Sequence, residues 1–337
     1  MKKILIIGPS WVGDMIMAQA LFKVLKEMDS NIQIDVLAPD WSLPVLARMS
    51  EVTEIICMPV SHGTFGLMQR IAIAKKLKSH GYTQAIVLAN SWKSALIPWF
   101  ARIPQRTGWL GEMRWGLLND VRYLNKAALP KMVQRYAALG LPNSMELPVN
   151  LPTPKLLAPA ESVALVLNKF ALSTQQPILA LCSGAAYGPA KRWPVEYFAK
   201  IAQQKIDSGW QVWFFGSNQD SVVIESIREK IVGTTFSFAA KIDLLETIDL
   251  LSAANAVVTN DSGLLHMAAS LDKPLVAIYG STSAEFTPPL GPRSKILQAS
   301  LPCRPCFKRE CPLQHLNCMY MIKPEQVLVA LEQLEAI

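Results

Sequence analysis

Short runs of apolar residues alternate with segments of helical period along most of the chain. In the first half, this pattern predicts strands at residues 3–7, 32–37 and 85–88 and a helix at 15–28. In the second half, it predicts strands at 178–182, 211–215, 236–239, 256–259 and 275–279, and helices at 195–206, 221–231, 244–253, 264–271 and about 324–334. Alternation of strands and helices predicts an α/β fold with parallel sheets that helices cover on both faces.

The pattern breaks between residues 142 and 159, where five prolines occur: Pro142, Pro148, Pro152, Pro154 and Pro159. Proline at this density prevents a helix or a central strand, so we predict a linker. The linker separates two domains, residues 1–150 and 160–320, and a C-terminal helix follows at 321–337. Ligands in open α/β sheets bind beyond the carboxyl ends of the strands, so we expect a site between the two domains.

Composition limits the classes of protein that the chain resembles. Of the 337 residues, 51% are hydrophobic and 18% charged, which allows packed cores and argues against disorder. The net charge of +7 favours acidic partners. The first apolar run stops at Gly8, which is too short for a signal peptide, and no run is long enough to span a membrane. We therefore expect a cytoplasmic protein whose cysteines are mostly reduced.

The loop from Gly8 to Asp14 follows the first predicted strand. Gly8 and Gly13 have the spacing of a P-loop, but Asp14 stands where that motif needs lysine and would repel phosphate. Pro9 and Ser10 break a dinucleotide fingerprint. Two interpretations of Asp14 remain: a residue that merely caps the following helix, or a general base that faces a ligand.

Three loops in the second half also follow predicted strands. The loop at 259–266 reads Thr-Asn-Asp-Ser-Gly-Leu-Leu-His and opens a helix, whose free amides suit an anion such as a diphosphate. The alternative is an ordinary capped helix with a packed histidine. The loop at 183–194 ends in two cations, Lys191 and Arg192, which either neutralise a diphosphate or lie at the surface. The loop at 215–220 ends in Asp220, an acid placed as those that hold a ribose hydroxyl.

Four cysteines lie close together near the C-terminus: Cys303, Cys306, Cys311 and Cys318. A Cys-x-x-Cys pair with two further thiols resembles the ligand set of a structural zinc site. The spacing is irregular, however, and a reduced or redox-variable cluster is the interpretation that we favour.

Three segments resemble glycosyltransferase family nine: Gly-Pro-Ser-Trp-Val-Gly-Asp at 8–14, Ala-Lys-Arg-Trp-Pro at 190–194, and the loop at 259–266. Segments at 90–96, 106–114 and 118–120 are similar to the members that add the second heptose to the lipopolysaccharide inner core. The resemblance implies a GT-B fold, with two Rossmann-like domains facing a central cleft. It also implies inverting, metal-independent transfer of L-glycero-D-manno-heptose from ADP-heptose onto the first heptose of that core.

The resemblance also implies roles for individual residues. Asp14 is the expected catalytic base, and Lys191 is expected to stabilise the leaving diphosphate. The expected donor-binding residues are Ser183, Gly184, Lys191, Arg192, Asp220, Ile242 beside the adenine, Asp261, Ser262, Gly263 and His266. The expected acceptor-binding residues are Ser10, Trp11, Lys93, Arg106 and Arg114. The partners are then ADP-heptose, a lipid-anchored inner-core acceptor and the cytoplasmic surface of the inner membrane, without nucleic acid.

Three other functions compete with this one. Another heptosyltransferase step, adding the first or a later heptose, would share the same motifs. A two-lobed periplasmic binding protein would also have two α/β domains and a hinge, but we would expect it to carry a signal peptide. A nicotinamide dehydrogenase is disfavoured by the broken glycine fingerprint.

Overall fold

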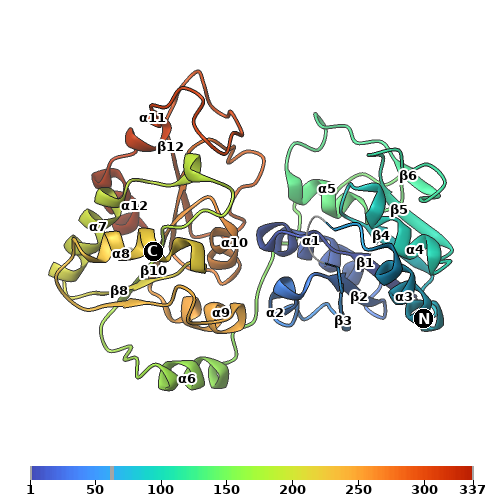
Figure 1. The fold of residues 1–337 in the computed structure, drawn as a ribbon, viewed down its shortest axis with the longest axis horizontal. Coiled ribbons are helices and arrows are strands. Elements are labelled where there is room, and N and C mark those ends of the chain that lie inside the picture. Colours follow the sequence, from blue (N-terminus) through green and yellow to red (C-terminus); the bar gives the residue numbers. More distant parts are fainter. Residues whose placement is uncertain (1, 61–63, 336–337) are drawn as a thin grey trace. The chain divides into compact units, whose positions relative to one another are not determined.

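The computed structural model describes residues 2–60 and 64–335. The chain divides into two compact units, Met1–Pro154 and Lys155–Ile337, so the boundary falls in the proline-rich segment (Figure 1). Each unit contains a parallel six-stranded sheet with helices packed on it, which is the fold class that the sequence predicts. Within the described ranges, the structure contains no helix with the length and apolar character that a membrane span requires.

The sheet of the first unit has the strand order β3-β2-β1-β4-β5-β6. Its strands are β1 (Lys3–Ile7), β2 (Gln33–Ala38), β3 (Glu54–Cys57), β4 (Gln84–Val87), β5 (Gln105–Trp109) and β6 (Asp120–Arg122). Its α-helices are α1 (Val12–Met28), α2 (Leu43–Leu46), α3 (Leu67–Leu77), α4 (Leu96–Phe100) and α5 (Met132–Ala138). Three short 3-10 helices, η1 (Asp40–Ser42), η2 (Lys78–His80) and η3 (Trp92–Ser94), complete the described elements of this unit.

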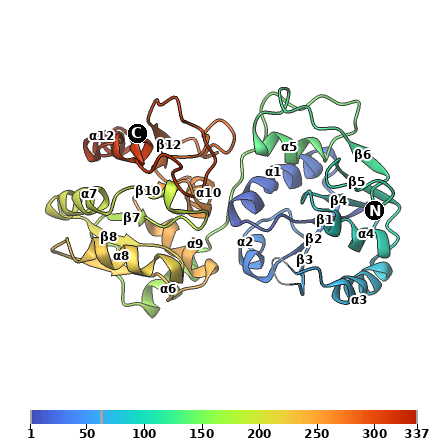
Figure 2. The ribbon, with the colours of Figure 1, turned by 45° about the horizontal axis from the view of Figure 1, so that its top comes forward.

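Helices cover both faces of this first sheet (Figure 2). On one face, Leu5 and Val87 of the central strands pack with Ile73 of α3 and Ile97 of α4 in one buried cluster. Because side chains alternate along a strand, Ile6 points to the opposite face, where α1 and α5 contact each other. Helix α1 is nearly covered, since eleven of its residues are buried. It is therefore a core helix, and its packing holds its first turn beside the sheet.

The sheet of the second unit has the order β12-β11-β10-β7-β8-β9. Its strands are β7 (Ile178–Cys182), β8 (Gln211–Phe214), β9 (Thr235–Ser237), β10 (Ala256–Asn260), β11 (Leu275–Tyr279) and β12 (Ser294–Gln298). Its α-helices are α6 (Ala160–Lys169), α7 (Val195–Asp207), α8 (Ser221–Arg228), α9 (Leu244–Ala253), α10 (Gly263–Ser270), α11 (Asn317–Tyr320) and α12 (Pro324–Glu335). The 3-10 helices are η4 (Pro189–Lys191) and η5 (Asn218–Asp220).

One face of the second sheet carries a large apolar core. Leu181 of β7 and Val258 of β10 pack there with Phe198 of α7, Ile224 of α8 and Leu331 of α12. Helix α12 contacts β10, β11 and β12, so the C-terminal helix is a part of this core. Helix α9 contacts both α6 and α10, and α10 also packs against β10 and β11.

The structure contains several elements that the hydrophobic pattern did not predict. Strands β3, β5, β6 and β12 are short or carry polar residues, and β3, β6 and β12 lie at or next to sheet edges where one face need not be buried. Helix α1 begins at Val12, three residues before the predicted start, so Asp14 lies inside the first turn. The predicted possibility that Asp14 is the N-cap is therefore wrong, because Trp11 occupies that position.

Candidate active site

The four inner strands of the second sheet end at one edge, where their loops meet. In the order β11-β10-β7-β8, neighbouring strands are followed by loops beginning at Gly280, Asp261, Ser183 and Phe215. Asn260 joins two of these loops, because its Nδ2 donates to the Ser183 carbonyl at 2.7 Å. The carboxyl edge of a parallel sheet is where ligands bind in such folds. The predicted donor loops therefore lie together at the expected edge.

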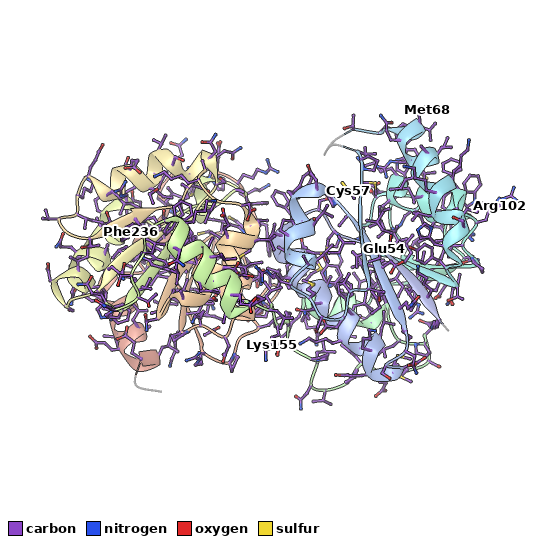
Figure 3. All side chains as sticks on the ribbon, turned by 90° about the horizontal axis from the view of Figure 1, so that it is seen from below. Glu54, Cys57, Met68, Arg102, Lys155 and Phe236 are labelled. Atoms are coloured by element: carbon purple, nitrogen blue, oxygen red, sulfur yellow. The ribbon has the colours of Figure 1, made fainter. Side chains whose placement is uncertain are left out.

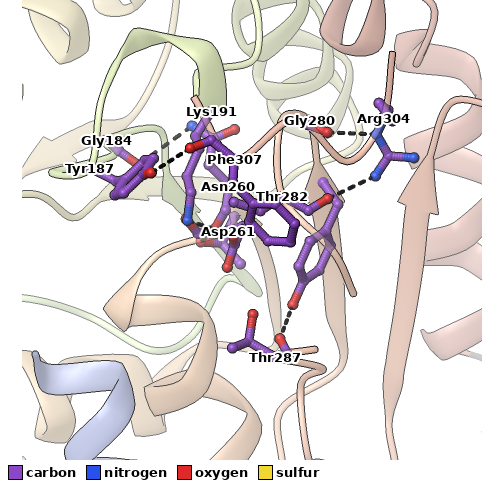
Figure 4. A network of polar contacts seen from close by, with 12 residues as sticks. Gly184, Tyr187, Lys191, Asn260, Asp261, Gly280, Thr282, Thr287, Arg304 and Phe307 are labelled. Carbon is purple, nitrogen blue, oxygen red and sulfur yellow. Dashed lines mark hydrogen bonds and ion pairs between the residues drawn. The ribbon is translucent and has the colours of Figure 1, made fainter. Parts of the chain in front are cut away.

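Lys191 and Asp261 form a short ion pair at this edge (Figure 4). Lys191 Nζ lies 2.6 Å from Asp261 Oδ2 and 3.3 Å from the Asp261 carbonyl, and both side chains are largely buried. Thr282 Oγ1 donates to the same carboxylate oxygen. The Lys191 ammonium has three hydrogens, so it can keep Asp261 and still donate to an anion. Asp261 thus fixes the position of the cation in the absence of ligand.

Asp220 lies in the neighbouring loop and is buried against two glycines. Its Oδ2 accepts hydrogen bonds from the backbone and hydroxyl of Ser217, at 2.9 and 2.7 Å. Its buried Oδ1 makes no hydrogen bond with the described protein and lies 3.8 Å from Arg192. A Cβ at Gly184 would lie 2.3 Å from the Asp220 carboxylate carbon, so only glycine fits there. Asp220 therefore has one buried oxygen without a hydrogen-bond partner among the described residues.

Helix α10 begins at the same edge with an uncovered N-terminus. Its N-cap, Ser262, makes no side-chain capping bond. The hydroxyls of Ser183, Ser262 and Ser281 are buried and lack a hydrogen-bond partner within the described residues. Buried polar groups usually have partners, so several unmatched groups in adjacent loops indicate a site for a polar ligand. The helix N-terminus favours an anion in that site.

His266 lies one turn into α10 and is buried. Burial lowers its pKa to about 4, while the Asp261 charge raises the pKa and the Lys191 charge lowers it. His266 is thus neutral near pH 7, and it can donate or accept a hydrogen bond but adds no positive charge. The predicted donor residues that carry a positive charge are therefore Lys191 and Arg192.

The segment that contains the cysteine cluster braces these donor loops. Tyr187 donates its hydroxyl hydrogen to the Phe307 carbonyl at 2.7 Å, and the Phe307 amide donates to the Ser281 carbonyl at 2.8 Å. The guanidinium of Arg304 donates to the carbonyls of Gly280 and Thr282 (Figure 4). The sequence did not predict these contacts, because every residue has a backbone carbonyl and no residue type marks the ones that accept.

The four cysteines themselves are free thiols in the structure. Throughout residues 2–60 and 64–335, no three His, Cys, Asp or Glu side chains are arranged so that they could hold a metal ion. Backbone hydrogen bonds from residues near Leu316 lower the pKa of Cys311, while burial raises the pKa of Cys318. The arrangement gives no support to the zinc alternative.

In the first unit, Asp14 lies at the carboxyl edge of the sheet, in the first turn of α1. No side chain caps this helix at its N-cap Trp11, so the helix dipole favours a negative charge at Asp14. Asp14 is half-buried and interacts with the hydroxyl of Tyr136. The Tyr136 hydroxyl thus helps to fix the Asp14 carboxylate at this edge.

Exposed aromatic side chains follow five strands of the first sheet. Trp11 follows β1, Trp41 follows β2, Phe65 follows β3, Trp92 follows β4 and Trp115 follows β5. Trp41 Nε1 donates to the Ser10 carbonyl at 2.8 Å, which joins the first two loops. The rings of Phe65 and Trp92 lie 5.2 Å apart. Exposed aromatic groups at a ligand-binding edge are typical of contacts with sugars or with a partner surface.

The predicted acceptor arginines have mainly structural contacts. Arg114 is fully buried and donates to the carbonyls of Ala89 and Trp109, so it joins the loops after β4 and β5. Arg106 donates to the carbonyls of Ile103 and Leu117, both at 2.7 Å. This geometry favours support of the loops over direct contact with an acceptor. Lys93 lies half-buried in η3, at the carboxyl edge.

The remaining predicted positions also lie at strand ends. Ser10 and Trp11 precede α1, and Ile242 lies in the turn between β9 and α9. The sequence analysis missed Thr282 and Tyr136, which contact Asp261 and Asp14. A candidate signal for Thr282 was its place just after an apolar strand, whereas nothing near Tyr136 in the sequence indicates its partner.

Comparison with known proteins extends this picture to nearly the whole chain. The sequence profile of "Glycosyltransferase family 9 (heptosyltransferase)" matches residues 70–317. Lipopolysaccharide heptosyltransferase 2 of Salmonella typhimurium is 42% identical over 98% of each chain. Lipooligosaccharide heptosyltransferase 2 of Haemophilus ducreyi is 47% identical over 88% of each chain. The solved structure of ADP-heptose lps heptosyltransferase II from E. coli matches with a TM-score of 0.90 and 40% identity, covering 100% of this chain and 99% of that one.

The extent of these matches also identifies the fold class. The two Rossmann-like units correspond, along their full length, to the chain of the E. coli enzyme, in agreement with the predicted GT-B fold. The chain is more than 40% identical, over most of both chains, to relatives that are named heptosyltransferase 2. The chain belongs to glycosyltransferase family 9, the heptosyltransferases.

Proposed function

We propose that this protein is an inverting heptosyltransferase that moves heptose from ADP-heptose onto the first heptose of the lipopolysaccharide inner core. The observation that carries the proposal is the match over nearly the whole chain to relatives named heptosyltransferase 2. The donor edge of the second unit supports it, because that edge offers a cation, an uncapped helix N-terminus and a buried acid at Asp220.

The proposed chemistry is a single displacement at the anomeric carbon. Asp14 accepts the proton of the acceptor hydroxyl while that oxygen attacks the sugar from the face opposite the ADP. The bond from the anomeric carbon to the diphosphate oxygen breaks in the same step, and its electron pair stays on the leaving ADP. One base suffices for one displacement, and Asp14 lies in the first turn of α1, where the helix dipole favours a negative charge.

The second unit is proposed to stabilise the charge that develops on the leaving ADP. Lys191 donates to the diphosphate while Asp261 holds the ammonium in place. The first amides of α10 and the hydroxyl of Ser262 contact the same anion. Asp220 Oδ1 accepts from the ribose, and Ile242 flanks the adenine. These contacts would perform the work that a divalent ion does in metal-dependent transferases.

An acceptor-selectivity assay tests the proposed reaction. Purified protein and ADP-heptose are offered two lipid acceptors, one without heptose and one with a single heptose, with and without EDTA. Transfer to the mono-heptosylated acceptor alone, undiminished by EDTA, is the expected result. Transfer to the bare acceptor would keep the reaction type but assign the first-heptose step. Loss of transfer with EDTA, restored by a divalent ion, would contradict the metal-independent mechanism.

The first unit is also proposed to rest on the membrane surface that carries the acceptor. Met68 of α3 and Trp99 of α4 are exposed on two helices that contact each other. Arg102 follows α4 and points away from the unit, as does Met68 (Figure 3). Exposed apolar groups beside cations suit an interface rich in anionic lipid. The membrane proposal thus rests on α3, α4 and the residues that follow α4.

A vesicle-binding measurement tests this membrane proposal. We expect the double variant Met68→Ser with Trp99→Ser to bind phosphatidylglycerol-containing vesicles about tenfold more weakly, because two exposed apolar groups are lost. Val222→Ser with Val329→Ser, two exposed apolar positions of the second unit, is the matched control and should bind as the unchanged protein does. Equal binding of both variants in a sedimentation assay would argue against this surface.

A further inference from the structure

Tyr136 brings a buried hydroxyl to Asp14 from a helix that is remote in sequence. It lies in α5, is 6% exposed and makes a side-chain hydrogen bond with Asp14. Helix α5 packs closely on α1: a Cβ at Gly140, just after α5, would lie 2.5 Å from Leu21 of α1. The pair is therefore built into the packing of two helices of the same unit.

Helix α5 is itself held at several points, so the Tyr136 hydroxyl has a fixed place. Trp109, at the end of β5, donates its indole hydrogen to the Arg135 carbonyl at 3.1 Å. Arg122 of β6 donates to the Leu141 carbonyl at 2.7 Å and to the Ala138 carbonyl at 3.3 Å. Ala137 and Leu141 pack with Val24 of α1. Supporting contacts of this kind fix a side chain that in turn orients a reacting group.

The hydroxyl of Tyr136 can only donate to Asp14. Burial raises its pKa well above the usual value, and the Asp14 charge and the hydrogen bond raise it further. The phenol therefore keeps its proton throughout the physiological range. A donated hydrogen bond stabilises the ionised carboxylate and occupies one of its lone pairs.

We propose that Tyr136 is a positioning residue that orients the Asp14 carboxylate and keeps it ionised, so that the carboxylate is ready to accept the proton of the acceptor hydroxyl. This inference rests on the proposed role of Asp14 as the base. It assigns Tyr136 no contact with substrate, because the side chain is buried. The geometry makes the pair a preorganised base rather than a carboxylate that samples several rotamers.

Few other charged groups lie on the elements packed here. Helix α5 carries Lys131 at its start and Arg135, which donates to the Leu129 carbonyl. In α1 the remaining charged residues, Lys23, Lys26 and Glu27, lie in its later turns. Helix α2, which also contacts α1, has none. Among the titratable groups on these helices, Tyr136 makes a side-chain hydrogen bond with Asp14.

A second tyrosine–aspartate pair in the same unit provides a matched control. Tyr82 donates to Asp35 Oδ2 at 2.8 Å, and Asp35 is completely buried. Lys3 also contacts Asp35, at 2.9 Å. Tyr82 precedes β4, so this pair lies toward the amino ends of the strands, away from the loop that carries Asp14. Loss of the Tyr82 hydroxyl should lower the stability of the protein without changing the geometry around Asp14.

The experiment compares Tyr136→Phe with Tyr82→Phe in thermal unfolding and in the pH profile of heptose transfer. We expect Tyr136→Phe to lower kcat by about tenfold at pH 7, as loss of one hydrogen bond to a charged group allows. The acceptor KM should stay unchanged. The acid limb of kcat/KM should move to higher pH, because the bond favours the ionised form. Tyr82→Phe should change the melting temperature and leave the kinetic parameters unchanged.

Asp14→Asn, run alongside, separates failure of this inference from failure of the base assignment. If Asp14→Asn abolishes transfer and Tyr136→Phe behaves as Tyr82→Phe does, the positioning role is overturned while the base stands. If Asp14→Asn transfers at the unchanged rate, the base assignment fails and the role of Tyr136 fails with it. A lowered kcat with a shifted acid limb in Tyr136→Phe alone supports the inference.

Discussion

Asp14→Asn is expected to lower kcat/KM for heptose transfer about a thousandfold, in the range that loss of a general base gives. Asparagine keeps the size of the side chain, but its amide cannot accept the proton of the acceptor hydroxyl at neutral pH. ADP affinity should not change, because the donor loops belong to the second unit. Steady-state kinetics and calorimetric titration with ADP check the two expectations.

The control for this variant is Asp29→Asn, at the other end of the same helix. Asp29 is exposed, follows the last turn of α1 and accepts a hydrogen bond from the Asn31 amide. The Asp29→Asn variant should transfer heptose at the rate of the unchanged protein. Asp14→Asn should also lose about 0.5 kcal/mol of stability, since the carboxylate interacts favourably with the helix dipole. A loss of activity that appears only above the melting temperature of the variant would contradict a chemical role.

The sequence predicted the inner strands of the second unit well, and the reason is physical. Strands β7, β10 and β11 are buried along their whole length, so each reads as an unbroken apolar run. Strand β5 reads Gln-Arg-Thr-Gly-Trp and escapes this rule, because its first residues are exposed or bonded to backbone carbonyls. A strand of that kind is determined by its neighbours in the sheet.

Residue types predicted the candidate site only in part. A cation at 191 and an acid at 261 were both assigned to the donor, but their ion pair depends on the distance between two loops. Arg114 has the right chemistry for an anionic acceptor, and the fold directs it to carbonyl groups instead. Tyr136, which bonds to Asp14, lies on α5, and this helix follows all six strands of the first sheet in the sequence. Which group a polar side chain meets is decided by tertiary packing, which periodicity does not record.

Lys191→Ala is expected to lower kcat/KM about a hundredfold or more, the effect of removing one electrostatic contact from a developing anion. The structure adds a second consequence. Asp261 is buried and, among the described residues, would keep the Thr282 hydroxyl as a side-chain donor, so its charge would lose its compensating cation. Breaking such a pair costs about 3 kcal/mol, and the thermal unfolding of the variant should show it. Lys200→Ala, which removes an exposed pair with Glu325, is the control and should change neither quantity appreciably.

The double variant Lys191→Ala with Asp261→Asn separates these two effects. Removal of the stranded charge should recover most of the lost stability, because an amide at 261 still accepts from Thr282. Transfer should stay as slow as in Lys191→Ala, since the Lys191 ammonium that meets the diphosphate is still missing. Recovery of transfer together with stability would mean that Lys191 serves only to neutralise Asp261. The diphosphate would then be held by the α10 N-terminus and by Arg192, which lies beside Asp220 at the same edge of the sheet.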